Sequence, residues 1–264
     1  MTLYRIKAIV LRHVILTFRD FHRFIDLIYW PILEIVIWGF TARWVQGNQV
    51  QPIQVSFILL TALVFWQVLL RAQLEVSFSF LDELWSHNLV NLFSTPLQLS
   101  EWIIAVMIIG FLKCIFTFIF GVAIIYILYL LNIIKLGFIL LVFLFLMICS
   151  GWTIGFLTTA AVAYWGQKIQ TLAWVMGWFF APFSGVFYPI SVLPYWAQII
   201  SASLPMSYLF EGIRTLITTG IVPTKMLFIC LGLNAIYLAL ALLVFKVAFE
   251  KSKVYGLARL ERYE

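Results

Sequence analysis

The sequence predicts an all-α membrane protein with six transmembrane helices. Hydrophobic residues make up 64% of its 264 residues and charged residues only 11%, whereas about 25% of a soluble domain is charged. A soluble fold of this size would need more polar side chains to cover its surface. The apolar residues also fall in long runs, and roughly 20 such residues cross a bilayer. Together these observations exclude a cytosolic enzyme, a secreted disulfide scaffold and a disordered chain.

Residues 1–23 precede the first span and predict a helix that lies in the membrane interface. Arg5, Arg12, Arg19 and Arg23 fall on one stripe at about 100° per residue, and apolar side chains occupy much of the remaining surface. This pattern is typical of an interfacial anchor. Contact with a partner protein is the alternative.

Six apolar runs predict the spans, and the distribution of basic residues predicts their orientation. The runs cover residues 24–44, 53–73, 102–131, 138–164, 169–188 and 226–249. Most Lys and Arg fall on the side that carries both termini, so both termini are expected in the cytoplasm. Lys113 lies within the third span and is expected to extend its amine to the interface. We expect one membrane domain over residues 1–264.

Other residues within the spans indicate packing. Small residues recur every four positions in the fourth span, a spacing that lets helices approach closely: Gly151, Gly155, Thr159 and Ala163. The Cys and His residues lack the spacing of a metal site. We therefore predict no metal site in this chain.

The segment 74–101 joins the second and third spans and is too long for a simple turn. Ser79-Phe80-Leu81-Asp82 has the form of a capping box, and Thr95-Pro96 is a helix stop. We expect a short amphipathic helix over about 80–95 at the cytoplasmic surface. It either rests on the membrane or docks a cytoplasmic partner, and acidic side chains are unfavourable against anionic lipid.

The segment 189–220 is apolar but too interrupted to span a membrane. Pro194 and Pro205 break it, together with Pro189. Glu211 and Arg214 are three residues apart and can pair on a helix. We expect either an outer cap or a pair of re-entrant helices that closes the exit of a pathway, with Pro194, Pro205, Glu211 and Arg214 forming this outer gate.

A few side chains within the spans are candidates for a transport pathway: Tyr29, Glu34, Trp178 and Phe183. Acids inside a membrane are functional candidates. Asp26 and Glu34 are separated by about 80° around a helix, so they need not face one cavity. The alternative function is an ion-driven secondary transporter that uses both acids.

No P-loop, nucleophile elbow or zinc-binding helix motif occurs in the sequence. We therefore expect no enzyme activity in this chain, and ATP hydrolysis would need another chain. A lipid-processing membrane enzyme and an anchor subunit without a pathway are the remaining alternatives.

Three motifs carry a resemblance to a known family: Ser94-Thr95-Pro96, Leu193-Pro194-Tyr195-Trp196 and Glu211-Gly212-Ile213-Arg214. Together with the order of elements, they resemble the permease subunit of type-2 ABC transporters over nearly the whole chain. The resemblance implies a permease homodimer in a bacterial inner membrane, surrounded by lipid. Two cytoplasmic ATPase chains would bind ATP and Mg, with no cofactor in this chain and no nucleic acid partner.

The resemblance also implies roles for particular residues. The helix at about 80–95 would be the coupling helix that enters a cleft of the ATPase, and residues 1–23 would be a second contact. The expected coupling residues are Asp82, Glu83, Trp85, His87, Asn88, Arg12 and Arg19. Polysaccharide exporters of this class usually carry Arg-Tyr-x-x-Ser-x-Leu-Gly before the first span, a pattern that residues 19–26 lack. This difference favours export of a drug, a lipid or a lipid-linked glycan.

Overall fold

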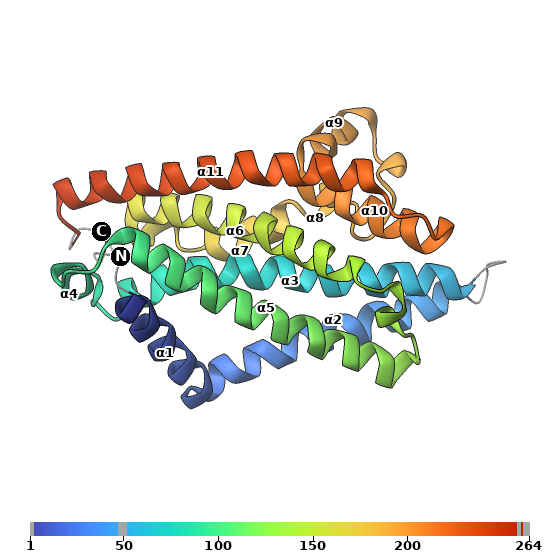
Figure 1. Ribbon diagram of the computed structural model, residues 1–264, viewed down its shortest axis with the longest axis horizontal. Helices are drawn as coiled ribbons and strands as arrows, with labels where there is room; N and C mark the ends of the chain where they lie inside the picture. Colours follow the sequence, from blue (N-terminus) through green and yellow to red (C-terminus); the bar gives the residue numbers. More distant parts are fainter. Residues whose placement is uncertain (1–2, 47–51, 258–259, 261–264) are drawn as a thin grey trace.

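The computed structural model describes residues 3–46, 52–257 and 260, and these residues form helices without any strand (Figure 1). The α-helices are α1 (Leu3–Arg19), α2 (Phe21–Gln46), α3 (Pro52–Trp85), α4 (Leu89–Ser94), α5 (Leu99–Tyr129), α6 (Ile139–Trp165), α7 (Leu172–Phe179), α8 (Ala181–Ser184), α9 (Tyr195–Ser203), α10 (Pro205–Thr219) and α11 (Thr224–Tyr255). Three short 3₁₀ helices complete the chain: η1 (Ile133–Leu136), η2 (Gly166–Ile169) and η3 (Ile190–Val192).

Five segments in the described ranges are long and apolar enough to cross a membrane: Phe21–Trp44, Val55–Trp85, Leu99–Tyr129, Ile139–Ile169 and Thr224–Tyr255. The shortest has 24 residues, or about 36 Å of helix, against a hydrocarbon core of about 30 Å. The predicted class of an all-α, multi-pass membrane protein is therefore confirmed.

Helices α3 and α6 form the centre of the bundle. Within the most apolar window of each, 78% of the residues are buried, compared with 17% for α11. A Cβ atom on Gly151 would lie 2.5 Å from the Leu69 carbonyl oxygen, and one on Gly155 would lie 2.9 Å from that of Gln73. The two helices approach so closely that side chains are excluded there. The close packing predicted from the small residues of α6 is confirmed.

The continuous helix expected over 169–188 does not form. Helix α7 ends at Phe179, α8 occupies only Ala181–Ser184, and Gly185 follows with a positive φ of 78°. Pro182 has no N–H to donate and disfavours a continuous helix through this point. The sixth crossing of the membrane remains a prediction.

The capping box expected at Ser79–Asp82 is wrong, because α3 continues without interruption to Trp85. Phe80, Leu81 and Leu84 are fully buried in the core, and continuing the helix is what buries them. The expected helix over 80–95 is instead the last turns of α3, a turn and the short α4. His87 adopts a positive φ of 50° in that turn.

The N-terminal helix is also shorter than the expected 1–23, since α1 ends at Arg19 and Arg23 belongs to α2. The first turn of α1, the whole of α4 and the last turns of α11 lie at one end of the bundle, with α9 and α10 toward the other (Figure 1). We call these the α4 end and the α9 end.

Candidate functional site

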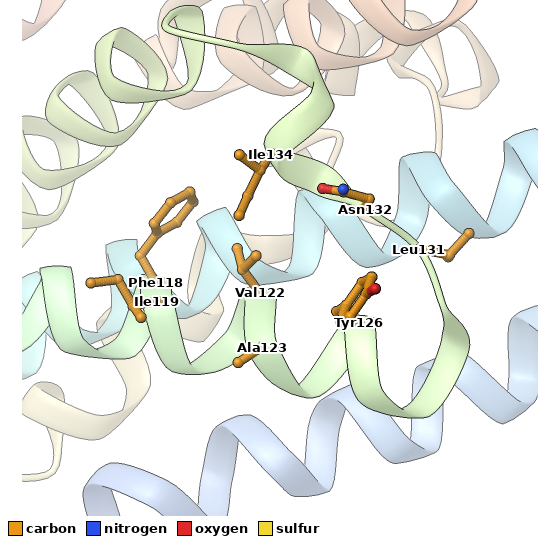
Figure 2. A pocket seen from close by; sticks show the side chains of 8 residues that line it. All are labelled: Phe118, Ile119, Val122, Ala123, Tyr126, Leu131, Asn132 and Ile134. Atoms are coloured by element: carbon orange, nitrogen blue, oxygen red, sulfur yellow. The ribbon is translucent and has the colours of Figure 1, made fainter.

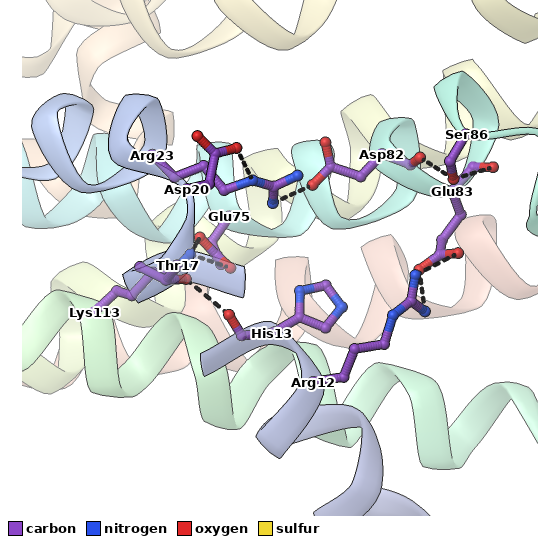
Figure 3. Close-up of polar contacts among 10 residues, drawn as sticks. All are labelled: Arg12, His13, Thr17, Asp20, Arg23, Glu75, Asp82, Glu83, Ser86 and Lys113. Atoms are coloured by element: carbon purple, nitrogen blue, oxygen red, sulfur yellow. Dashed lines mark hydrogen bonds and ion pairs between the residues drawn. The ribbon is translucent and has the colours of Figure 1, made fainter. Parts of the chain in front are cut away.

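Oppositely charged side chains from α1, α2, α3 and α5 meet in the half of the bundle nearer the α4 end (Figure 3). We call this set the α4-end network: Arg12, Arg23, Glu75, Asp82, Glu83 and Lys113. Helix α1 turns a buried face toward the bundle, formed by Ile6, Ile9, His13 and Thr17. These positions recur at three- and four-residue spacing, so they share one side of the helix. Burial of that face brings Arg12 next to Glu83 of α3.

Arg12 is paired with Glu83, with 2.7 Å between the guanidinium and the carboxylate oxygen. The Glu83 side chain is only 2% exposed. Its second oxygen accepts a hydrogen bond of 2.6 Å from the side-chain amide of Asn88 in the turn before α4. Glu83 thereby connects α1, α3 and the turn that leads into α4.

A second ion pair fixes the junction between α1 and α2. The Arg23 guanidinium lies 2.7 Å from Asp82 and 3.2 Å from Asp20. Asp20 stands between the two helices and also accepts a hydrogen bond of 2.9 Å from the backbone N–H of His22. The same side chains therefore fix the angle between α1 and α2 and attach both to the end of α3.

The third pair is the most enclosed. The Lys113 amine lies 2.7 and 2.8 Å from the two carboxylate oxygens of Glu75, which is 9% exposed. The predicted extension of Lys113 toward the interface is wrong, because its charge is neutralised inside the bundle by Glu75.

His13 lies between the Lys113–Glu75 pair and the Arg12–Glu83 pair (Figure 3). Burial lowers the pKa of His13 from its ordinary value of 6.5, while the nearby Glu75 acts in the opposite direction. A buried imidazole is favoured in its neutral form because the charged form loses its hydration.

The expected coupling residues divide into two groups. Arg12, Asp82, Glu83 and Asn88 bond one another or Arg23 within the chain, as described above. Trp85, His87 and Arg19 are exposed, and the Trp85 indole N–H donates a 2.7 Å hydrogen bond to Gln170. The turn between α3 and α4 is therefore exposed at the surface, and the bonds of Glu83 and Asn88 hold it to α1 and α3.

The α9 end contains the predicted Glu211–Arg214 pair, at 3.0 Å. The Glu211 carboxylate also accepts a 2.7 Å hydrogen bond from the N–H of Ile190, and Arg214 donates one of 2.9 Å to the Gly185 carbonyl. The pair therefore fastens α10 to the irregular chain after α8. Pro205 is the first residue of α10, a position where proline is favoured, and Pro194 is the residue directly before α9.

Two serines that the sequence analysis missed complete this end. Ser201 and Ser207 are buried, and both donate hydrogen bonds to the Phe183 carbonyl, at 2.6 and 3.1 Å. Irregular backbone inside a membrane is tolerated only where its polar groups find partners. These hydroxyls supply partners for the break after α7. Their signal in the sequence was weak, because serine in an apolar run does not indicate which carbonyl it serves.

A cavity of about 120 Å³ lies between α2, α3 and α7. Asp26 and Glu34 both line this cavity. Their separation around the helix had left open whether they face one cavity. Asp26 is paired with Arg71 at 3.1 Å. Glu34 is 9% exposed, and one of its carboxylate oxygens has no hydrogen-bond partner in the described structure.

The structure brings two of the four predicted pathway residues together. Trp178 lines the same cavity as Glu34. Tyr29 is exposed and packs against Trp30, and Phe183 belongs to α8, where it packs against Trp196. We refer to the space that Glu34 and Trp178 share as the tryptophan-lined cavity, because Trp30 and Trp174 also line it.

A separate pocket of about 330 Å³ lies between the end of α5 and the turn around η1 (Figure 2). Its lining is mostly apolar: Phe118, Ile119, Val122, Ala123, Tyr126, Leu131, Asn132 and Ile134. An apolar lining of this kind suits contact with lipid.

No group of three or more His, Cys, Asp or Glu in the described ranges is arranged to hold a metal ion. Neither a scan against models of known protein families nor a search of curated proteins finds a match to this chain.

Proposed function

We propose that this chain is the permease subunit of an ATP-driven exporter of the type-2 ABC class. A separate cytoplasmic ATPase, in two copies, would hydrolyse ATP, and two permease chains would form a homodimer. The cargo would be a drug, a lipid or a lipid-linked glycan moved outward across a bacterial inner membrane. The α4 end would face the cytoplasm together with both termini.

The observation that carries the proposal is the construction of the α4 end. The exposed turn at Trp85–His87 and the short α4 lie at the end of the bundle, and Glu83 ties the turn to α1 and α3. A segment that receives force from another protein needs such a rigid attachment, since a loose loop would absorb the displacement. Closure of the ATPases would move α4 and shift the bundle between two arrangements.

The remaining assignments follow from this orientation. Helix α6 ends at the α4 end and α11 begins at the α9 end (Figure 1). The 172–190 stretch, despite the break after α7, would therefore complete a sixth crossing. Helices α9 and α10 would be the re-entrant pair, and Glu211–Arg214 would hold the outer gate.

The test is reconstitution with the cytoplasmic ATPase whose gene lies nearest to that of this chain. Asn91→Arg changes an exposed residue of α4, and Thr218→Arg makes the matched change at an exposed position of α10. We expect Asn91→Arg to abolish complex formation and ATP-dependent transport, whereas Thr218→Arg preserves complex formation. Retention of both activities by Asn91→Arg, or transport by the chain alone, contradicts the proposal.

The second candidate is an ion-driven transporter, and the observation that favours it is the shared cavity of Asp26 and Glu34. It predicts transport in vesicles without ATP that is lost in Glu34→Gln. The Arg71 partner of Asp26 argues against it, because a paired carboxylate is a poor carrier of protons.

A further inference from the structure

We propose that the tryptophan-lined cavity binds a compact organic cation through Glu34. That the cavity binds such a cation is argued from the structure alone. That the cation is the exported substrate rests on the proposed export function.

The first step is the unmatched hydrogen-bonding capacity of the cavity wall. Three side chains that line the cavity each have an atom without a hydrogen-bond partner in the described structure: Glu34 Oε2, Gln67 Nε2 and Gln73 Oε1. Their residues are 9%, 6% and 0% exposed. The Gln67 amide lies beside the Glu34 carboxylate and interacts with it. The capacity that remains for a polar occupant is therefore on Glu34 Oε2 and Gln73 Oε1, and buried polar atoms in native proteins are nearly always paired.

The second step is charge. Among the described residues that line the cavity, Arg71 is the one cation, and it bonds both the carboxylate and the backbone carbonyl of Asp26. The Glu34 carboxylate has no such partner. An ionised carboxylate without a counter-charge is costly inside a membrane. The cavity therefore favours an occupant with one positive charge.

The third step is the indole wall. Trp30, Trp174 and Trp178 line the cavity, and each is about half exposed. Trp178 is held against Trp66 and Trp174 against Phe78, both in edge-to-face contact. Tryptophan faces are the strongest aromatic partners of alkylammonium groups. Fixed indoles beside an uncompensated carboxylate match an ammonium group better than a neutral sugar.

Size limits the occupant. A cavity of about 120 Å³ accommodates a single ammonium group with short alkyl substituents. Two sources supply this chemistry, namely a free small amine and the headgroup of a choline or ethanolamine lipid.

The experiment uses the full chain in phosphatidylglycerol nanodiscs, which contain no competing ammonium group. Calorimetry compares choline with its neutral isostere 3,3-dimethylbutan-1-ol. We expect choline to bind at least tenfold more tightly, Glu34→Gln to lose at least tenfold in choline affinity, and Glu250→Gln, an exposed carboxylate elsewhere, to match the unmodified chain. Equal affinity for the two probes, no binding of either, or unchanged affinity in Glu34→Gln overturns the proposal.

Trp178→Leu provides an independent variant should Glu34→Gln fail to fold, and we expect it to weaken choline binding threefold or more. Unchanged choline affinity in a folded Trp178→Leu overturns the aromatic contribution and with it the proposal. Repetition in phosphatidylcholine nanodiscs separates the sources: suppressed choline binding identifies a lipid headgroup, and unchanged binding identifies a free amine. Choline binding without ATP-driven export would refute the proposed function but support the cation site. ATP-driven export without choline binding would support the proposed function but refute the cation site.

Discussion

The two ends of the bundle hold their irregular segments by different chemistry. At the α4 end, full charges from α1 and α2 meet acids of α3, and Lys113 of α5 meets Glu75. The α9 end has one ion pair, Glu211–Arg214, and relies otherwise on hydroxyls and the Arg214 guanidinium that donate to the carbonyls of a broken helix. Removal of one partner leaves a buried charge at the first end but mostly a neutral carbonyl at the second. The α4 end should therefore be the more sensitive to single substitutions.

The largest effect is expected from Lys113→Met, which leaves the Glu75 carboxylate buried without a counter-charge. The free energy of unfolding should fall by about 3–5 kcal/mol, measured by denaturant unfolding in mixed micelles. Lys253→Met removes the exposed Lys253–Glu250 pair and should cost less than about 1 kcal/mol. A Lys113→Met/Glu75→Met double variant should recover much of the loss, and equal losses in the two Lys variants would refute the distinction.

A smaller effect is expected from Arg12→Gln. Arg12 is 42% exposed, so water compensates part of the lost pair, and Asn88 still donates to Glu83. We expect a loss of about 1–2 kcal/mol, together with faster hydrogen exchange along α1. Arg19→Gln, at the exposed end of the same helix, is the control and should exchange like the unmodified chain. Unaltered exchange in Arg12→Gln would show that the pair does not hold α1.

At the α9 end, Ser201→Ala combined with Ser207→Ala removes both side-chain donors from the Phe183 carbonyl. The expected loss is about 1 kcal/mol, as for one unpaired neutral group, measured by the same unfolding experiment. Each single variant keeps one donor and should lose less. Ser203→Ala, whose exposed hydroxyl bonds only Ile200, is the control. A loss in the double variant as large as that of Lys113→Met would erase the contrast between the ends.

The smallest effect concerns pH and the α4 end. The pKa of His13 lies below 6.5 in the folded state because of burial, among Arg12, Glu75, Glu83 and Lys113. Below pH 6.5 the unfolded chain gains a proton that the folded chain does not take up, so stability should fall as the pH drops. Above pH 6.5 the residue is neutral in both states and contributes no pH dependence.

The measurement is the melting temperature between pH 7.5 and 5.5. The melting temperature of His13→Leu should fall less on acidification than that of the unmodified chain. His22→Leu changes an exposed residue, and its melting temperature should fall as much as that of the unmodified chain. Identical acid sensitivity of the chain and His13→Leu would exclude His13 as the cause.

The sequence predicts what depends on local spacing. Apolar run lengths predict the long helices, and the three-residue interval predicts the Glu211–Arg214 pair. The Arg12–Glu83 and Lys113–Glu75 pairs were not predicted, because they join helices that only the tertiary fold brings together. The capping box at Ser79 failed for the same reason: burial of Phe80 and Leu84 outweighs a local cap.

Helix α3 reaches both the α4 end and the tryptophan-lined cavity as a single unbroken helix. Its 34 residues span about 50 Å, whereas the α7–α8 stretch is interrupted at Phe180. An unbroken helix such as α3 transmits a displacement along its axis, whereas the α7–α8 stretch bends where its helix is interrupted. Strain applied near Trp85 would therefore reach Gln67 along α3, and α8 could stay in place while α7 tilts.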